Sequence, residues 1–377
     1  MPVPVQRPMG VSVSYRGETR LDFSWSELTG AVGDSVTVLP VVVAVAVLTE
    51  LSLAVMLLWF GVFQVVWGLY YGVPVSVEPM KALAALAIAG TLTAGEFLVA
   101  GLLAGVVLLV VGLTGTLSRV EAYVGAPVIR GVQLGVALVL LETGVQLGAA
   151  DPQLAGAGVA VATGAVALGA RRSTGLVVLL AGAGVALWTT GLPAPSLPSL
   201  EGLLLFSTAD LTADAAGGAL AQLGMTVGNA ALATSLLLAD YFDRDVSADE
   251  LSTSMGAMNL AAVPLGALPM CHGSGGVAGK YGFGARTAGA NVILGVGYAA
   301  VALLAVEVIA AYPMAVLGVV LGLVALQLGW TSLQRADTGG YPLVVAVGVV
   351  GLLVSLGVAF VGGVAIHLLR RRLARGA

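Results

Sequence analysis

Charged residues are scarce in this chain, and lysine, histidine and cysteine are almost absent. Of its 377 residues, 10% are charged and 58% are hydrophobic, whereas soluble domains are typically about 25% charged. Apolar stretches near the roughly 20 residues that cross a bilayer recur along the whole sequence. The composition therefore excludes a soluble protein and predicts a polytopic membrane protein.

The missing residue types also exclude several kinds of chemistry. A single cysteine, Cys271, cannot form an intramolecular disulfide, and it directly precedes His272, a poor arrangement for joint metal ligation. Gly279-Lys280 resembles the end of a P-loop, but Tyr281 replaces the required Ser or Thr. No nucleophile–base set is recognisable, and the net charge of -4 is small. We expect no enzyme, metal, cofactor or nucleic-acid partner.

Fourteen transmembrane segments are expected in an all-α fold. Twelve apolar stretches are clear, and a last one of about 29 residues suits two short helices. The stretches are 28–48, 51–71, 73–89, 97–113, 127–145, 154–170, 176–188, 217–238, 251–267, 269–290, 292–311, 313–330 and 341–369. They divide the chain into a polar tail (1–25), a first seven-span repeat (26–190), an extracytoplasmic connection (191–214), a second repeat (215–369) and a basic tail (370–377).

The arginines support this count. If the N-terminus is cytoplasmic, the even-numbered loops are cytoplasmic too and should be rich in arginine. We therefore expect a multi-pass protein of the plasma (inner) membrane with both termini in the cytoplasm. The arginines of those loops and of the C-terminal tail are Arg119, Arg171, Arg172, Arg244, Arg335, Arg370, Arg371, Arg372 and Arg375.

The two halves echo each other in sequence. Three short motifs recur in the same order at offsets of 195, 190 and 187 residues. Because each repeat has an odd number of spans, the two copies must lie in opposite orientation, which is the inverted-repeat architecture of secondary transporters. The pairs are 32–34 with 227–229, 79–80 with 269–270, and 131–135 with 318–322.

Spans three and ten are predicted to be discontinuous. Prolines and valines before Pro79 disfavour a helix, whereas the residues from Pro79 onward favour one. In span ten, the glycines after Pro269 allow backbone to approach a ligand closely. Two half-helix N-termini and Lys81 would then form an anion site. A proline kink in a plain helix is the alternative for span three.

The candidate binding residues cluster around these breaks, since a charged side chain at bilayer depth is costly and usually faces a pathway or a partner. Four acids within spans are candidates for ion coupling or, equally, for fixed ion pairs: Asp34, Glu78, Glu142 and Glu307. The candidate substrate-binding residues are Asp34, Glu78, Pro79, Met80, Lys81, Thr226, Asn229, Met270, Cys271, His272, Gly273, Ser274, Gly275, Gly276 and Lys280.

Three segments resemble the molybdate transporter family, a branch of the sulfate permease (SulP) superfamily. They are 75–81 (VSVEPMK), 128–135 (VIRGVQLG) and 269–287 (PMCHGSGGVAGKYGFGART), which lie in both halves of the chain. The resemblance implies a core domain, containing spans one, three, eight and ten, that moves against a gate domain, and uptake of molybdate or sulfate. Glu78 and Lys280 depart from it, because the family commonly has Gln at both positions.

The sequence favours a secondary transporter of a tetrahedral oxyanion, namely molybdate, sulfate or tungstate, coupled to protons or sodium. The alternative is a permease of the same fold that carries another substrate, such as a nucleobase. Two further alternatives from a different functional class are an anion channel and a structural membrane subunit. The lipid bilayer is an expected partner, and the sequence leaves open whether the protein forms a homodimer.

Overall fold

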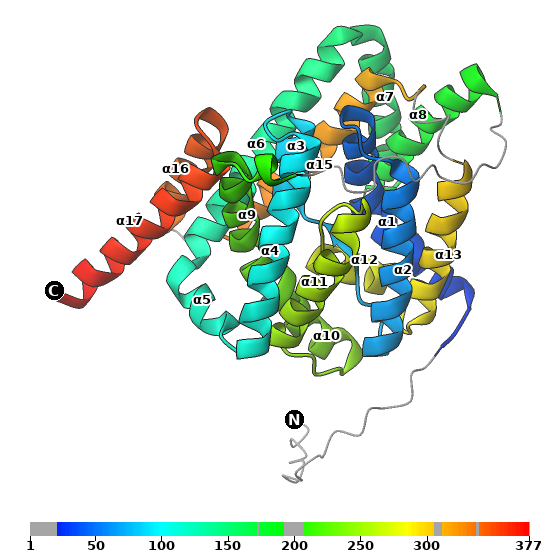
Figure 1. Ribbon diagram of the computed structural model, residues 1–377. Helices are drawn as coiled ribbons and strands as arrows, with labels where there is room; N and C mark the ends of the chain where they lie inside the picture. The colour runs from blue at the N-terminus through cyan, green and yellow to red at the C-terminus, as the bar shows by residue number, and fades with distance from the viewer. Residues whose placement is uncertain (1–20, 172, 192–206, 305–310, 337–338, 377) are drawn as a thin grey trace, which may run out of the picture.

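The computed structural model describes residues 21–171, 173–191, 207–304, 311–336 and 339–376. Glu307, most of the predicted N-terminal tail and much of the predicted connection lie outside these residues. The described part is almost entirely helical (Figure 1).

Helical elements occupy every apolar stretch of the first half. In chain order the elements are α1 (Trp25–Leu48), α2 (Leu53–Tyr71), β1 (Glu78–Pro79), α3 (Lys81–Ile88), α4 (Ala94–Thr114), α5 (Leu117–Val124), α6 (Ala126–Ala150), α7 (Pro152–Ala167) and α8 (Thr174–Thr190).

The second half repeats this order. Its elements are η1 (Thr208–Asp210), α9 (Ala213–Met225), the π-helical η2 (Thr226–Leu232), α10 (Ala233–Phe242), α11 (Ala248–Ala262), η3 (Val263–Leu265), β2 (Met270–Cys271), α12 (Ser274–Gly282), α13 (Gly289–Leu304), α15 (Met314–Gln334), α16 (Tyr341–Leu353) and α17 (Leu356–Gly376).

Several of these helices are long and apolar enough to cross a bilayer. Among the described residues five qualify by length and composition: α2, α4, α6, α15 and the continuous run from Ala213 to Phe242. Helix α1 is a sixth if its two parts, which meet at a 45° bend between Val36 and Val38, form one span. Apart from α17, which has 21 residues and carries four arginines near its end, the remaining helices are shorter, so the number of fourteen spans stays a prediction.

The packing of the helices is nearly symmetric between the two halves. Helix α2 packs on α13, and its counterpart α11 packs on α4 (Figure 1). Likewise α1 packs on α12 and α9 on α3, while α16 packs on α6 and α7 on α15. Exchanging the halves therefore converts each of these contacts into another that is present, as expected for a duplicated unit.

Two groups of helices result. Helices α1 to α4 and α9 to α13 surround the β1–β2 pair, and α6, α7, α8, α15, α16 and α17 form the second group, in which α6 and α15 make the most extensive contact. The two strands thus lie inside the first group, where the sequence predicted the binding site.

Small residues let the paired helices approach closely. Where α2 crosses α13, a Cβ added at Gly61 would lie 2.8 Å from the carbonyl oxygen of Gly295. One added at Gly295 would lie 2.6 Å from the carbonyl oxygen of Gly61. Glycine pairs of this kind are typical of helix contacts in membranes, where backbones pack without intervening side chains.

We predict that Gly295→Ala destabilises the protein, because its methyl group would meet backbone atoms that have no room to move. Overpacking of this kind costs about 1–3 kcal/mol. The matched control is Gly297→Ala on the same helix, where a Cβ meets no atom within 4 Å. Thermal unfolding in detergent should show a lower melting temperature for the first variant only, and equal melting temperatures would contradict the close crossing.

Candidate functional site

The site is built where two extended segments cross. Strands β1 and β2 pair in antiparallel fashion, with Glu78 opposite Cys271 and Pro79 opposite Met270. The Met80 N–H also donates to the carbonyl of Pro269 at 2.8 Å. Helix α3 begins directly after β1, and α12 begins three residues after Cys271. The two helices therefore leave one crossing with both N-termini near it.

Side chains of neighbouring helices satisfy the buried backbone of these segments. Asn259 on α11 accepts from the N–H of Met270 at 2.7 Å and donates to its carbonyl at 2.6 Å. Gln64 on α2 donates to the carbonyl of Val77 at 3.2 Å. Backbone that leaves the helix inside a membrane requires such partners, because lipid offers none.

His272 connects the two segments directly. Its Nδ1 lies 2.9 Å from the carbonyl oxygen of Ser76, and its Nε2 lies 2.8 Å from the hydroxyl of Ser254, which also accepts from Tyr71. Because a carbonyl can only accept, Nδ1 carries a proton. The ring is fully buried, so its geometry is that of a fixed cross-link between β2 and the segment before β1.

A buried ion pair lies behind the crossing. The ammonium of Lys280 is 3.2 Å from a carboxylate oxygen of Asp34, and both side chains are 0% exposed. Asp34 also accepts from Ser76 at 2.6 Å and from Gln64 at 2.7 Å. The other acceptors of the Lys280 ammonium are the carbonyl of Val75 at 2.6 Å and the side-chain oxygens of Gln64 at 2.8 Å and Asn291 at 3.0 Å.

A second ion pair lies at the crossing itself. One carboxylate oxygen of Glu78 pairs with the ammonium of Lys81, and the other accepts from the N–H of Gly276 at 2.5 Å. Glu78 is 1% exposed, whereas the Lys81 side chain is 24% exposed. The Glu78 carboxylate thus occupies the N-terminus of α12, where backbone N–H groups favour a negative charge.

Gln222 caps the other helix and was missed by the sequence analysis. Its side-chain oxygen accepts from the N–H groups of Ala82 at 2.9 Å and Leu83 at 3.4 Å, and its amide donates to Thr226 at 2.9 Å. The signal in the sequence was a glutamine inside an apolar stretch. Thr226 begins the π-helical segment η2, a distortion that is frequent at functional sites.

A small cavity lies between the two helix N-termini. Its volume is about 30 Å³. The residues that line it are Glu78, Pro79, Lys81, Gln222, Met225, Thr226, Asn229, Ala230, Cys271, His272, Gly273, Ser274 and Gly275.

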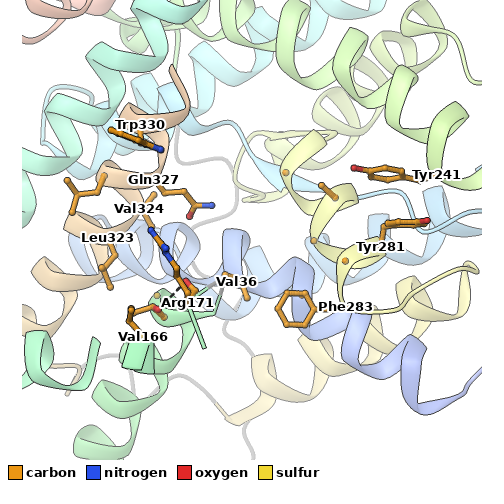
Figure 2. A pocket seen from close by; sticks show the side chains of 18 residues that line it. Val36, Val166, Arg171, Tyr241, Tyr281, Phe283, Leu323, Val324, Gln327 and Trp330 are labelled. Carbon is orange, nitrogen blue, oxygen red and sulfur yellow. Dashed lines mark hydrogen bonds between the residues drawn. The ribbon is translucent and has the colours of Figure 1, made fainter. Parts of the chain in front are cut away.

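This small cavity opens on one side of the protein. A second cavity of about 560 Å³ shares Lys81, Asn229, Ser274 and Gly275 with it and extends along α15 to Arg335. A third, of about 1150 Å³, continues from Gly275 between α12 and α15. Figure 2 shows Tyr241, Tyr281 and Phe283 on one wall of this third cavity and Arg171, Gln327 and Trp330 on the other.

The same openings break the symmetry between the halves. Helix α3 packs against α6, and its residues from Ala82 to Ile88 are all buried. On the equivalent side of α12, the cavities separate that helix from α15, and Gly275 and Gly282 are exposed. One of two equivalent routes to the crossing is therefore closed, and the other is open.

The structure brings most of the predicted site residues together. Glu78, Pro79, Lys81, Thr226, Asn229 and residues 271–275 line the small cavity, while Met80, Met270 and Gly276 lie beside it in the crossing. Asp34 and Lys280 do not line it but form the buried pair behind it. Glu142 lies on the exposed side of α6, where it accepts a hydrogen bond from Gln146 at 3.4 Å.

We predict that the Asp34–Lys280 pair tolerates removal of both charges better than removal of one. Lys280→Met leaves a buried carboxylate without its ammonium, which should lower the free energy of unfolding by about 3–5 kcal/mol. The double variant Asp34→Asn/Lys280→Met should recover much of this loss. Thermal unfolding of the purified variants measures both effects, and a double variant no more stable than the single one would contradict the pairing.

Two neighbouring glycines should differ sharply in their tolerance of a methyl group. A Cβ at Gly276 would overlap with oxygens of Asp34 and Ser76, whereas the nearest atom to one at Gly275 is a Glu78 oxygen at 3.7 Å. Gly276→Ala should therefore destabilise by about 1–3 kcal/mol, and Gly275→Ala should fold like the parent protein. Equal melting temperatures would show that the crossing is looser than described.

Comparison with known proteins gives the family. The model of the family described as "Molybdate transporter of MFS superfamily" matches residues 26–140 and 214–328, one stretch in each half. Molybdate transporter 2 of Arabidopsis thaliana is 29% identical over 91% of this chain and 87% of its own length. Molybdate transporter 1 of Chlamydomonas reinhardtii is 28% identical over 89% of each chain.

Solved structures identify the fold. The transmembrane domain of the cyanobacterial bicarbonate transporter BicA superposes with a TM-score of 0.67 at 20% identity, covering 89% of this chain and 97% of that domain. Murine Slc26a9 in its inward-facing state superposes with a TM-score of 0.67 at 15% identity, covering 94% of this chain and 69% of that one. The matched family and these folds confirm the resemblance seen in the sequence motifs: the chain belongs to the molybdate transporter family, with an SLC26-like fold.

Proposed function

We propose that the chain is a secondary transporter of a tetrahedral oxyanion, with molybdate as the first candidate and sulfate or tungstate as close analogues. The observation that carries this proposal is the convergence of two helix N-termini and Lys81 on one cavity. The curated relatives, whose names describe molybdate transporters, support molybdate as the substrate.

The chemistry of the cavity suits an oxyanion. The N-termini of α3 and α12 place backbone N–H groups and the positive ends of their dipoles at the crossing. Lys81 adds a full positive charge and is the part of the Glu78–Lys81 pair that solvent reaches. Thr226, Asn229 and Ser274 add neutral hydrogen-bonding groups that can serve the oxygens of the anion.

The one-sided opening supports alternating access. In the proposed orientation, with fourteen spans and both termini in the cytoplasm, Arg171 and Arg335 mark the cytoplasmic side, toward which the cavities open. In the opposite state, α12 would close against α15 as α3 now does against α6, and the route beside α3 would open. The inverted repeat provides two such equivalent arrangements.

Lys81→Met should abolish oxyanion uptake, because the variant lacks the full charge at the site. Parent or variant protein should be reconstituted into proteoliposomes, and the uptake of labelled molybdate and sulfate should be measured with and without a pH gradient. We expect saturable uptake by the parent protein and less than about a tenth of it by the variant, since loss of a hydrogen bond to a charged group costs about 1.5–3 kcal/mol.

The double variant Lys81→Met/Glu78→Gln is the control for folding, because it removes the charge of both members of the pair. A double variant that is stable but still inactive assigns the loss to the site. Normal uptake by Lys81→Met would overturn the assignment of the site. Anion conductance far above carrier turnover would instead indicate a channel.

A further inference from the structure

We propose that the Glu78 carboxylate competes with the substrate anion for the same hydrogen-bond donors. The carboxylate leaves its position when it takes up one proton. The inference rests on the proposed function, since it concerns how the same site admits its anion. In this structure, Glu78 contacts both the N-terminus of α12 and Lys81. A divalent oxyanion takes both, and one proton from solvent neutralises the displaced carboxylate.

Glu78 already makes the contacts that a bound oxyanion needs. Its two oxygens engage two different donors, the Lys81 ammonium and the Gly276 N–H. A Cβ added at Gly273 would overlap with the same carboxylate, so the group fills the space directly in front of the α12 N-terminus. Anion and carboxylate cannot use these donors together.

The size of the cavity leads to the same conclusion. Its volume is only about 30 Å³, and the Glu78 carboxylate lies against the donors that a tetrahedral oxyanion would need. Beyond it lies the larger cavity of about 560 Å³ that also reaches Lys81. Movement of the Glu78 side chain would enlarge the space next to the required donors.

The charges around Glu78 determine how many protons are taken up with each bound anion. Among the described residues, the charged or titratable groups near Glu78 are Lys81 on α3, Cys271 on β2, His272 directly after β2, Asp34 on α1, Lys280 on α12 and Tyr298 on α13. Asp34 and Lys280 offset each other as an ion pair. The Glu78–Lys81 pair is likewise neutral, so a divalent anion would meet only the helix dipoles, roughly half a positive charge at each N-terminus.

One proton on Glu78 restores the charge balance between the site and a divalent anion. When Glu78 is neutral, the charge of Lys81 and the two partial helix charges together offset the two negative charges of the oxyanion. The proton comes from solvent through the open cavities and is released when the anion leaves and the carboxylate returns. Asp34 is less suited to this exchange, because it does not line the cavity and is paired with Lys280 behind the crossing.

The test is the pH dependence of anion binding to the purified full-length protein in nanodiscs. Sulfate and molybdate are titrated calorimetrically between about pH 6 and 8, in buffers of different ionisation enthalpy so that proton uptake is counted. For the parent protein, we expect about one proton per anion and an affinity that rises about tenfold for each pH unit lowered. The variant is Glu78→Gln, and the matched control is Glu50→Gln in the exposed loop after α1.

Glu78→Gln should bind the anion with an affinity that is nearly independent of pH, without proton uptake, and more tightly than the parent protein at pH 8. Glu50→Gln should behave like the parent. The same proton uptake and pH slope in Glu78→Gln as in the parent would overturn the inference while leaving oxyanion binding intact. Absence of binding to the parent protein at every pH would instead reject the proposed function.

Discussion

Two extended segments cross inside an apolar protein, and the polar groups of their backbones must find partners that lipid cannot supply. This requirement explains several of the buried polar side chains in the first group of helices. Asn259 serves both backbone groups of Met270, Gln64 serves Val77, and His272 holds the carbonyl of Ser76. The crossing exists because these side chains replace the hydrogen bonds that a continuous helix would have made.

The two lysines of the chain occupy different environments at this crossing. Lys280 is surrounded by acceptors and is 0% exposed, so its charge is used to hold α1, α2, α13 and the segment before β1 together. Lys81 has Glu78 as its partner and remains partly open to a cavity. A buried charge with a complete set of partners stabilises the scaffold, whereas one that solvent reaches can exchange its partner for a ligand.

Much of this arrangement could be predicted from the sequence, and the exceptions have physical reasons. Prolines at 79 and 269 indicated where helix gives way to extended chain, because proline restricts the backbone locally. The side of α12 on which Lys280 lies depends on the rotation of that helix against α1 and α2, which is a property of the packing. Gln222 was missed for the same reason, since a single glutamine in an apolar stretch does not reveal which N-terminus it caps.

The caps of α3 and α12 differ in the way that the proposed proton exchange requires. Helix α3 is capped by the amide of Gln222, whose charge does not change with pH, and α12 is capped by the carboxylate of Glu78. A duplicated unit therefore carries a neutral cap at one helix and a titratable cap at the other. The titratable cap belongs to α12, the helix beside the open cavities. In the exchange proposed above, protons and anions would approach Glu78 through these cavities, while α3, buried against α6, would keep the opposite side closed.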